Sequence, residues 1–159
     1  MKRHALNISC SKILKNNRIP MIYTCDGKNI NPPIETGNLP SNTKSIAVIM
    51  EDNEMPQSGS VHWLAYNIPA SGIIHENEKN CLCGLNDFNN KSYTGPCPDH
   101  GKHKYLFRIY ALDDFLYFNH ENVSRLDIEE GIRYHIIGYG ELVGYYERSE
   151  QFNLVKIAG

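Results

Sequence analysis

Four polar side chains in otherwise apolar segments are the residues best suited to chemistry. They are Asp52, His62, His103 and Tyr105. The two imidazoles and the phenol can donate hydrogen bonds, and the carboxylate can accept them. Because each lies in or at the end of an apolar segment, the four would converge in one cleft if those segments are neighbouring strands. The alternative is structural, with His62 and Tyr105 in the core and Asp52 capping a turn.

Two of the segments that must position these residues are typical of buried β-strands. Residues 45–50 form a continuous apolar run that ends next to Asp52, as expected of a strand buried on both faces. Residues 61–68 form a second run, which Pro69 ends. Only residues 53–60 separate the two runs, so the sequence predicts that they belong to one local unit.

A third run and the loop before it complete the predicted site. Residues 104–112 form the third run. A period of two that extends back to residue 103 places His103 and Tyr105 on the same face of this strand. Residues 86–101 are rich in Asn, Asp, Gly and Pro and are too long for an ordinary hairpin. Prolines and glycines in residues 95–101 restrict the backbone directly before His103, which suits a preformed ligand wall.

The rest of the chain predicts a mainly β protein with little helix. Aromatic and β-branched residues occur in short runs between turn residues, which is typical of strands. One helix is predicted to begin after Ser124, a good cap, and to end near Gly138. Isoleucine recurs every four residues along it, at Ile128, Ile132 and Ile136. Residues 139–147 return to an alternating strand pattern.

Length and composition predict one cytoplasmic domain over residues 1–159. The hydrophobic share of 41% is enough for a sizeable core. The net charge of −2 offers no basic surplus for nucleic acid. No apolar run approaches the ~18 residues of a membrane span, and the polar start at residues 1–17 lacks a signal-peptide core. The five cysteines, an odd number in such a chain, are predicted to be thiols.

Several short motifs in this order are similar to those of one known family. They are Asp52-Asn53-Glu54-Met55-Pro56, Val61-His62-Trp63, Gly95-Pro96-Cys97-Pro98 before His103-Lys104-Tyr105, and Tyr110-Ala111-Leu112-Asp113. The combination resembles the phosphatidylethanolamine-binding protein family, and most closely its bacterial Raf-kinase-inhibitor-like branch. The likeness covers most of the chain.

The resemblance implies a β-sandwich-like domain of antiparallel sheets with a few short helices. It also implies a non-enzymatic protein without a cofactor, whose small surface pocket takes phosphate-like anions or phospholipid head groups. By the same resemblance a kinase or another signalling protein is a candidate partner, and a homodimer is compatible with the sequence. The implied ligand-binding residues are Asp52, Pro56, His62, Gly95, Pro96, Cys97, Pro98, His103 and Tyr105.

Acidic residues complicate this anion pocket. His62, His103 and Tyr105 can each donate to phosphate oxygens, but a carboxylate repels them. We therefore expect Asp52 to orient a histidine or to accept a hydrogen bond from an ammonium group. The sequence also departs from the family pattern, with Asp99 in place of a second loop proline. That change makes the pocket more negative and leaves a zwitterionic or neutral ligand open.

Two alternatives use Cys97. One is a metal site that combines Cys97 with His100 and His103 and with the Cys81-x-Cys83 pair, although this spacing matches no common zinc finger. The other is a cysteine hydrolase in which Cys97 is the nucleophile and a histidine is the base. If Cys97 lies beside the histidines as a thiol, it would also be open to oxidation.

Overall fold

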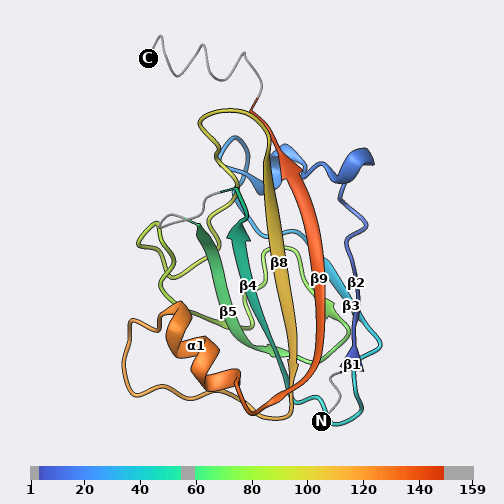
Figure 1. The fold of residues 1–159 in the computed structure, drawn as a ribbon, viewed down its shortest axis with the longest axis vertical. Helices are drawn as coiled ribbons and strands as arrows, with labels where there is room; N and C mark the ends of the chain where they lie inside the picture. Colours follow the sequence, from blue (N-terminus) through green and yellow to red (C-terminus); the bar gives the residue numbers. More distant parts are fainter. Residues whose placement is uncertain (1–3, 55–59, 149–159) are drawn as a thin grey trace.

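The structure is a computed structural model that describes residues 4–54 and 60–148 (Figure 1). Its strands are β1 (His4–Ala5), β2 (Asn7–Ser9), β3 (Ile34–Gly37), β4 (Ser45–Asp52), β5 (Val61–Pro69), β6 (Ile73–Ile74), β7 (Leu82–Cys83), β8 (His103–Leu112) and β9 (Ile136–Tyr146). Its helices are the short 3₁₀ turns η1 (Lys15–Asn17) and η2 (Met21–Tyr23) and the single α-helix α1 (Arg125–Ile132). The mainly β class is therefore confirmed.

The strands form two sheets of unequal size. Six strands pair in the order β1-β9-β8-β4-β5-β7, and three pair in the order β2-β3-β6. All the pairs are antiparallel except β1 with β9, which run parallel. The expected antiparallel sheets are thus found, with one parallel pair at this edge. Because almost the whole chain separates β1 from β9, no tight turn imposes the antiparallel direction.

The predicted central strands pair as one unit. The run at residues 45–50 lies in β4, which is buried along its whole length, between β5 and β8. The short connection from β4 to β5 joins antiparallel neighbours, as predicted. β8 pairs with β4 from Ser45 opposite Leu112 to Asp52 opposite Tyr105. The ends that carry the polar candidates therefore meet at one end of the sheet.

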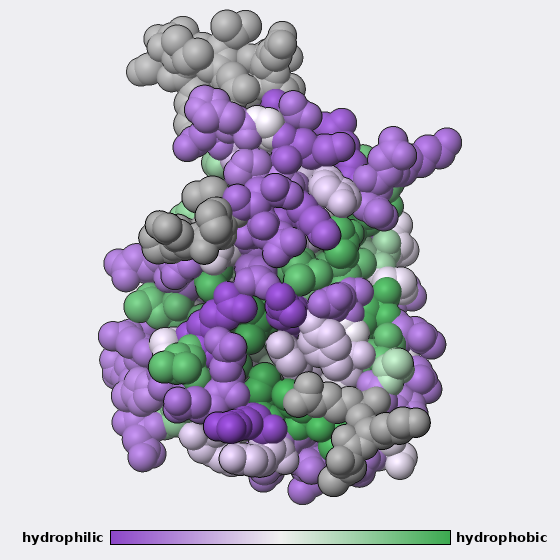
Figure 2. Space-filling view, in the orientation of Figure 1, coloured by the Kyte–Doolittle hydropathy of each residue, from purple (hydrophilic) through white to green (hydrophobic). Residues whose placement is uncertain are grey.

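A separate hydrophobic core covers each face of the large sheet. On one face, Val48 of β4 and Phe107 of β8 pack with Ile34 and Ile74 of the small sheet. On the other face, Ile49 packs with Ile128 and Ile132 of α1, which lies beside the lower ends of β4 and β5 (Figure 1). In Figure 2, hydrophilic residues gather at the upper end of the visible surface, and apolar residues form separate patches below them.

The helix begins as predicted and ends early. Ser124 Oγ accepts a hydrogen bond from the Asp127 backbone N–H at 3.1 Å, and the Asp127 carboxylate accepts one from the Ser124 N–H at 2.9 Å. This capping box fixes the first turn. The helix stops at Ile132, so the expected end near Gly138 is wrong. Ile136 begins β9 instead. Gly140 of β9 packs so closely against Ile8 that a Cβ there would lie 2.5 Å from Ile8 Cγ1.

The expectation that all five cysteines are thiols is also wrong. Cys25, just after η2, is disulfide-bonded to Cys97 in the long loop, with the two Cα atoms 5.5 Å apart. Cys10, Cys81 and Cys83 are free. The bonded cysteines are 72 positions apart in the sequence, so no local sequence pattern reveals their proximity. No helix in residues 4–54 and 60–148 is long and apolar enough to cross a membrane, and the cytoplasmic location stays a prediction.

Candidate functional site

A cavity of about 390 Å³ lies where the ends of β4, β5 and β8 meet the long loop. We call it the candidate pocket. Its walls come from Asp52, His62, Phe88, Cys97, Pro98, Asp99, His100, His103 and Tyr105. The four polar residues singled out by type and spacing therefore share one cavity, which their separation along the chain could not establish.

Asp52 orients one of the two histidines. It is the last residue of β4 and is only 5% exposed. Its Oδ2 accepts a hydrogen bond from His103 Nδ1 at 2.7 Å, and its Oδ1 accepts one from the Glu54 backbone N–H at 2.9 Å. Both oxygens are thus engaged by the protein. The imidazole of His103 is left with Nε2 as its second polar atom.

A register shift directs His62 into the pocket. Met50 of β4 pairs with Trp63, but Glu51 pairs with Val61, so His62 is an extra residue in the ladder. In a regular ladder His62 would oppose Glu51 and lie on the α1 face. The shift instead places it on the face of Trp63, where its ring lies 5.4 Å from that of Tyr105. Bulges that redirect a side chain are common next to functional sites.

The hydrogen bonds of His62 fix its tautomer. Its Nδ1 lies 2.7 Å from the Thr94 carbonyl, which can only accept, so Nδ1 carries the proton. Burial lowers the pKa of His62, although the Thr94 carbonyl and the charge of Asp52 oppose this effect. The ring is therefore neutral near pH 7, and its Nε2 is an acceptor.

Tyr105 contributes a buried hydroxyl to the same cavity. The residue is fully buried, and its Oη has no partner with regular hydrogen-bond geometry among the described residues. The Cys97 backbone N–H approaches the oxygen as a donor, so the group without a partner is the hydroxyl proton. Burial raises the pKa of Tyr105, and the negative charge of Asp52 raises it further, so the hydroxyl keeps its proton. A buried donor without a partner costs roughly 1–3 kcal/mol. The other such side-chain atom among the described residues is Thr36 Oγ1 in β3, outside the candidate pocket.

Asn86 organises the loop that forms the outer wall. The residue is buried, and its Nδ2 lies 2.9 Å from the His62 carbonyl and 3.0 Å from the Ser92 carbonyl. Its Oδ1 accepts from the backbone N–H groups of Phe88 at 2.9 Å and Asn90 at 3.0 Å. This closed set of bonds holds Phe88 over the pocket, with its ring 4.8 Å from that of His62.

Cys97 is fixed from the opposite side of the loop. Cys97 is bonded to Cys25 through the disulfide. In addition, the Cys25 backbone N–H donates to the carbonyl of Pro96, the residue before Cys97, at 3.1 Å. The Gly95 N–H donates to Asn29 Oδ1 at 2.7 Å, and a Cβ on Gly95 would lie only 2.2 Å from the Tyr23 carbonyl oxygen. The stiff loop predicted from its glycines and prolines is thus held by a covalent bond as well.

The predicted ligand-binding residues divide into three groups. Six line the candidate pocket, namely Asp52, His62, Cys97, Pro98, His103 and Tyr105. Gly95 and Pro96 are buried and are not among the lining residues, so their contribution is the path of the loop. Pro56 lies outside the described residues. Phe88 was not predicted as a site residue, and an aromatic side chain within a polar loop was the available signal.

Both alternatives that rely on Cys97 lose their central group. A sulfur atom bonded to Cys25 is neither a thiolate nucleophile nor a thiolate metal ligand. Within the described part of the chain, no group of three or more His, Cys, Asp or Glu residues has the arrangement of a metal site. The oxidation expected of a free Cys97 is replaced by a disulfide that is already formed.

Comparisons with known proteins agree on one family. A sequence model of the phosphatidylethanolamine-binding protein family matches residues 9–147. A UPF0098 protein of Pyrococcus horikoshii is 40% identical over 155 residues, covering 90% of this chain and 78% of the relative. A UPF0098 protein of Archaeoglobus fulgidus is 38% identical and matches 93% of this chain, which spans about half (54%) of that relative. The crystal structure of a phosphatidylethanolamine-binding protein homologue from Chlamydia trachomatis has a TM-score of 0.83 and 33% identity, covering 92% of this chain and 99% of that chain.

Proposed function

Because the chain belongs to the phosphatidylethanolamine-binding protein family, we propose that the candidate pocket binds a phosphate-like anion or a phospholipid head group without changing it chemically. The observation that carries the proposal is Tyr105, which lines the cavity and whose buried hydroxyl proton has no acceptor among the described residues. A ligand oxygen that accepted this hydrogen bond would remove the cost of leaving the donor unpaired.

The histidines supply the remaining polar contacts. His103 gives its Nδ1 proton to Asp52, so its Nε2 is the ring atom left for a ligand. When the ring is charged, Nε2–H donates to the ligand and Asp52 supplies the compensating negative charge. Neutral His62 accepts through Nε2 and suits a protonated phosphate oxygen or an ammonium group. Tyr105 and His103 therefore donate, and His62 accepts. This pattern fits a singly protonated phosphate better than a fully ionised one.

The carboxylates of the pocket favour a zwitterionic ligand. Both oxygens of Asp52 accept hydrogen bonds from the protein, so this carboxylate is not free to bind the ammonium of a head group. Asp99 lines the rim and is exposed. It is the carboxylate placed to contact an ammonium, and it weakens the binding of a bare anion. Phosphoethanolamine should therefore bind more tightly than inorganic phosphate.

A partner protein can present the same chemistry. A phosphorylated side chain carries the same oxygens as a head group, and docking it would block a kinase or another signalling enzyme. The family resemblance supports this second candidate. An arm of the experiment with a phosphoserine peptide separates it from head-group binding.

The experiment is an NMR titration of the labelled protein with inorganic phosphate, phosphoethanolamine, ethanolamine and a phosphoserine peptide. We expect saturable shifts at His62, Phe88, His103 and Tyr105, with phosphoethanolamine the tightest of the small ligands. Asp99→Asn should reduce the preference for phosphoethanolamine over phosphate.

Two variants separate binding from folding. His103→Ala removes one donor and should weaken phosphate binding about tenfold, which corresponds to roughly 1.4 kcal/mol. His135→Ala is the matched control, because His135 also pairs with an aspartate, Asp113, at 2.8 Å but lies outside the candidate pocket. No shift at millimolar ligand, or equal losses in both variants, would contradict the proposal.

A further inference from the structure

β7 is the edge strand of the large sheet, and it carries two thiols outside the candidate pocket. Cys83 ends β7, and Cys81 immediately precedes it. Residues two apart in an extended strand lie on the same side, and both cysteines pack against the core of the small-sheet face. Both also line a second cavity of about 420 Å³. The fold therefore brings two free thiols together in one hollow.

The sheet register explains the surroundings of Cys83. Cys83 pairs with Ala65 of β5, so Trp63, two residues earlier in β5, is its diagonal neighbour. The Trp63 indole N–H, which can only donate, interacts with the Cys83 sulfur. The Cys81 thiol donates to the Glu78 carbonyl at 3.8 Å, and its sulfur interacts with that of Cys83. Of the two sulfurs, Cys83 is therefore the one beside the indole N–H.

These contacts give the two thiols different properties. The interaction with Cys81, together with the Trp63 N–H and the charge of Lys79, lowers the pKa of Cys83 to about 7 despite burial. The interaction with Cys83, followed by burial, raises the pKa of Cys81 well above its ordinary value. Cys83 therefore has the properties of an attacking thiolate, and Cys81 those of a second thiol that keeps its proton.

We propose that Cys81 and Cys83 form a thiol–disulfide exchange site for small, negatively charged disulfides. The cavity provides space beside the sulfurs, and the side chains of Lys79 and Lys91 line it. Neither lysine has an ion pair with a carboxylate among the described residues. Glu78 also lines this cavity, but the two lysines outnumber it, so the net positive charge would attract a disulfide that carries carboxylates.

The exchange consists of two displacements. The Cys83 thiolate attacks one sulfur of the disulfide RSSR, so a Cys83–SR bond forms and RS⁻ leaves and takes a proton from water. The Cys81 thiol then loses its proton to water and attacks Cys83 Sγ. A Cys81–Cys83 bond forms, and the second RS⁻ leaves and is protonated. The protein loses two electrons, RSSR gains two, and an excess of RSH reverses both steps.

The internal bond needs a backbone that is not fully extended, and Cys81 lies in a bend directly before β7. Residues two apart in an extended strand have Cα atoms roughly 6.7 Å apart, near the upper limit for a disulfide. β7 pairs on one side only, with β5, so small backbone adjustments are available to it. A bond formed under such strain is easily reduced, which suits reversible exchange rather than structural cross-linking.

The test uses the full chain with oxidised glutathione as the negatively charged probe and cystamine as the positively charged one. We follow the products by intact mass and peptide mapping, in the presence of a chelator. At pH 7, a pKa of 7 instead of 9 gives Cys83 roughly fiftyfold more thiolate, while its lower basicity removes about eightfold in nucleophilicity. Cys83 should therefore react at least about sixfold faster than Cys10, whose pKa burial raises.

The expected end product is an internal Cys81–Cys83 disulfide without a stable glutathione adduct, and reduced glutathione should reverse it. The Cys81→Ala variant should instead accumulate a mixed disulfide at Cys83. In the Cys83→Ala variant, the remaining thiol of Cys81 should react no faster than Cys10. Cys10→Ser is the matched control and should leave the reaction at β7 unchanged. The double variant Lys79→Gln with Lys91→Gln should react about two- to threefold more slowly with oxidised glutathione, and its reaction with cystamine should not slow.

Three results would overturn the proposal. The first is equal reactivity of Cys83 and Cys10, and the second is a stable adduct on the wild-type chain without an internal bond. The third is stoichiometric uptake of Zn²⁺, without the chelator, that blocks both thiols, because these residues would then form a metal site. Because the cysteines of β7 are not lining residues of the candidate pocket, each result is independent of phosphate binding.

Discussion

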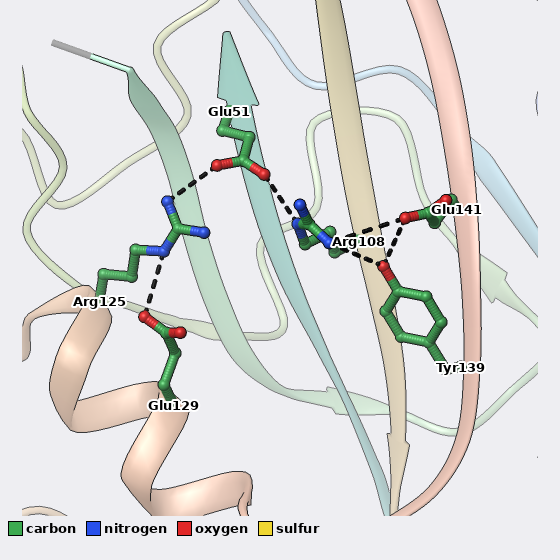
Figure 3. A network of polar contacts seen from close by, with 6 residues as sticks. All are labelled: Glu51, Arg108, Arg125, Glu129, Tyr139 and Glu141. Atoms are coloured by element: carbon green, nitrogen blue, oxygen red, sulfur yellow. Dashed lines mark hydrogen bonds and ion pairs between the residues drawn. The ribbon is translucent and has the colours of Figure 1, made fainter. Parts of the chain in front are cut away.

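The two faces of the large sheet give adjacent carboxylates of β4 different surroundings. Glu51 and Asp52 follow one another in β4 and are similarly buried, at 9% and 5% exposure. Glu51 lies on the α1 face, where its two oxygens accept from Arg108 Nε at 2.7 Å and from Arg125 Nη1 at 2.9 Å. Figure 3 shows how these contacts continue to Glu129, Tyr139 and Glu141. Asp52 lies on the opposite face, in the candidate pocket.

The difference lies in which polar groups remain unpaired. On the α1 face the Tyr139 hydroxyl donates to Glu141 at 2.7 Å and accepts from Arg108 at 3.2 Å. On the pocket face the buried hydroxyl proton of Tyr105 has no acceptor among the described residues. Two tyrosines on neighbouring strands thus differ in whether the hydroxyl proton has an acceptor. A satisfied network stabilises the fold, whereas an unsatisfied donor is available to a ligand.

The largest expected effect concerns the covalent support of the pocket face. Replacing both Cys25 and Cys97 with Ser frees a loop of 72 residues in the unfolded chain. The entropic model predicts a loss of about 4 kcal/mol in the free energy of unfolding. Urea unfolding measures the loss, and Cys10→Ser is the control. A loss under about 1 kcal/mol would mean that the hydrogen bonds of the loop suffice without the disulfide.

The next effect concerns the ionic support of the α1 face. Glu51→Gln leaves Arg108 and Arg125 without their shared charge and should cost about 2 kcal/mol of stability. This is less than for a fully buried pair, because the arginine side chains are each 32% exposed. Phosphate binding should not change, because Glu51 is on the other face. Weaker binding in this variant would show that the two faces are coupled through β4.

The same network predicts a pH dependence. Burial alone would raise the pKa of Glu51, but the hydrogen bonds from Arg108 and Arg125 outweigh it and hold the pKa below the ordinary value of 4.5. The stabilisation is therefore complete above about pH 4.5 and is lost as the pH falls through the lower, folded-state pKa. Acid unfolding of Glu51→Gln should be less steep in this window, and parallel curves would contradict the assignment.

The comparison also explains what the sequence could predict. Period two in β8 correctly put His103 and Tyr105 on one face, because β8 pairs with β4 without a break from Ser45 to Asp52. The same rule applied to β5 would have put His62 on the α1 face. The register shift beside Glu51 reverses that placement, and it depends on pairing between strands rather than on local pattern. The Cys25–Cys97 bond was missed for a related reason, because it joins segments far apart in the chain.

The smallest effect is the sharpest test of the comparison, because the same change should act in opposite directions on the two faces. Tyr105→Phe removes an unpaired buried hydroxyl, so the free energy of unfolding should rise by about 1 kcal/mol while phosphate binding weakens. Tyr139→Phe removes a paired hydroxyl, so stability should fall by about 0.5 kcal/mol and binding should not change. Urea unfolding and phosphate titration of both variants provide the four values. If Tyr105→Phe lowered stability as Tyr139→Phe does, its hydroxyl would have a protein partner, and the pocket would lose the donor on which the proposed function depends.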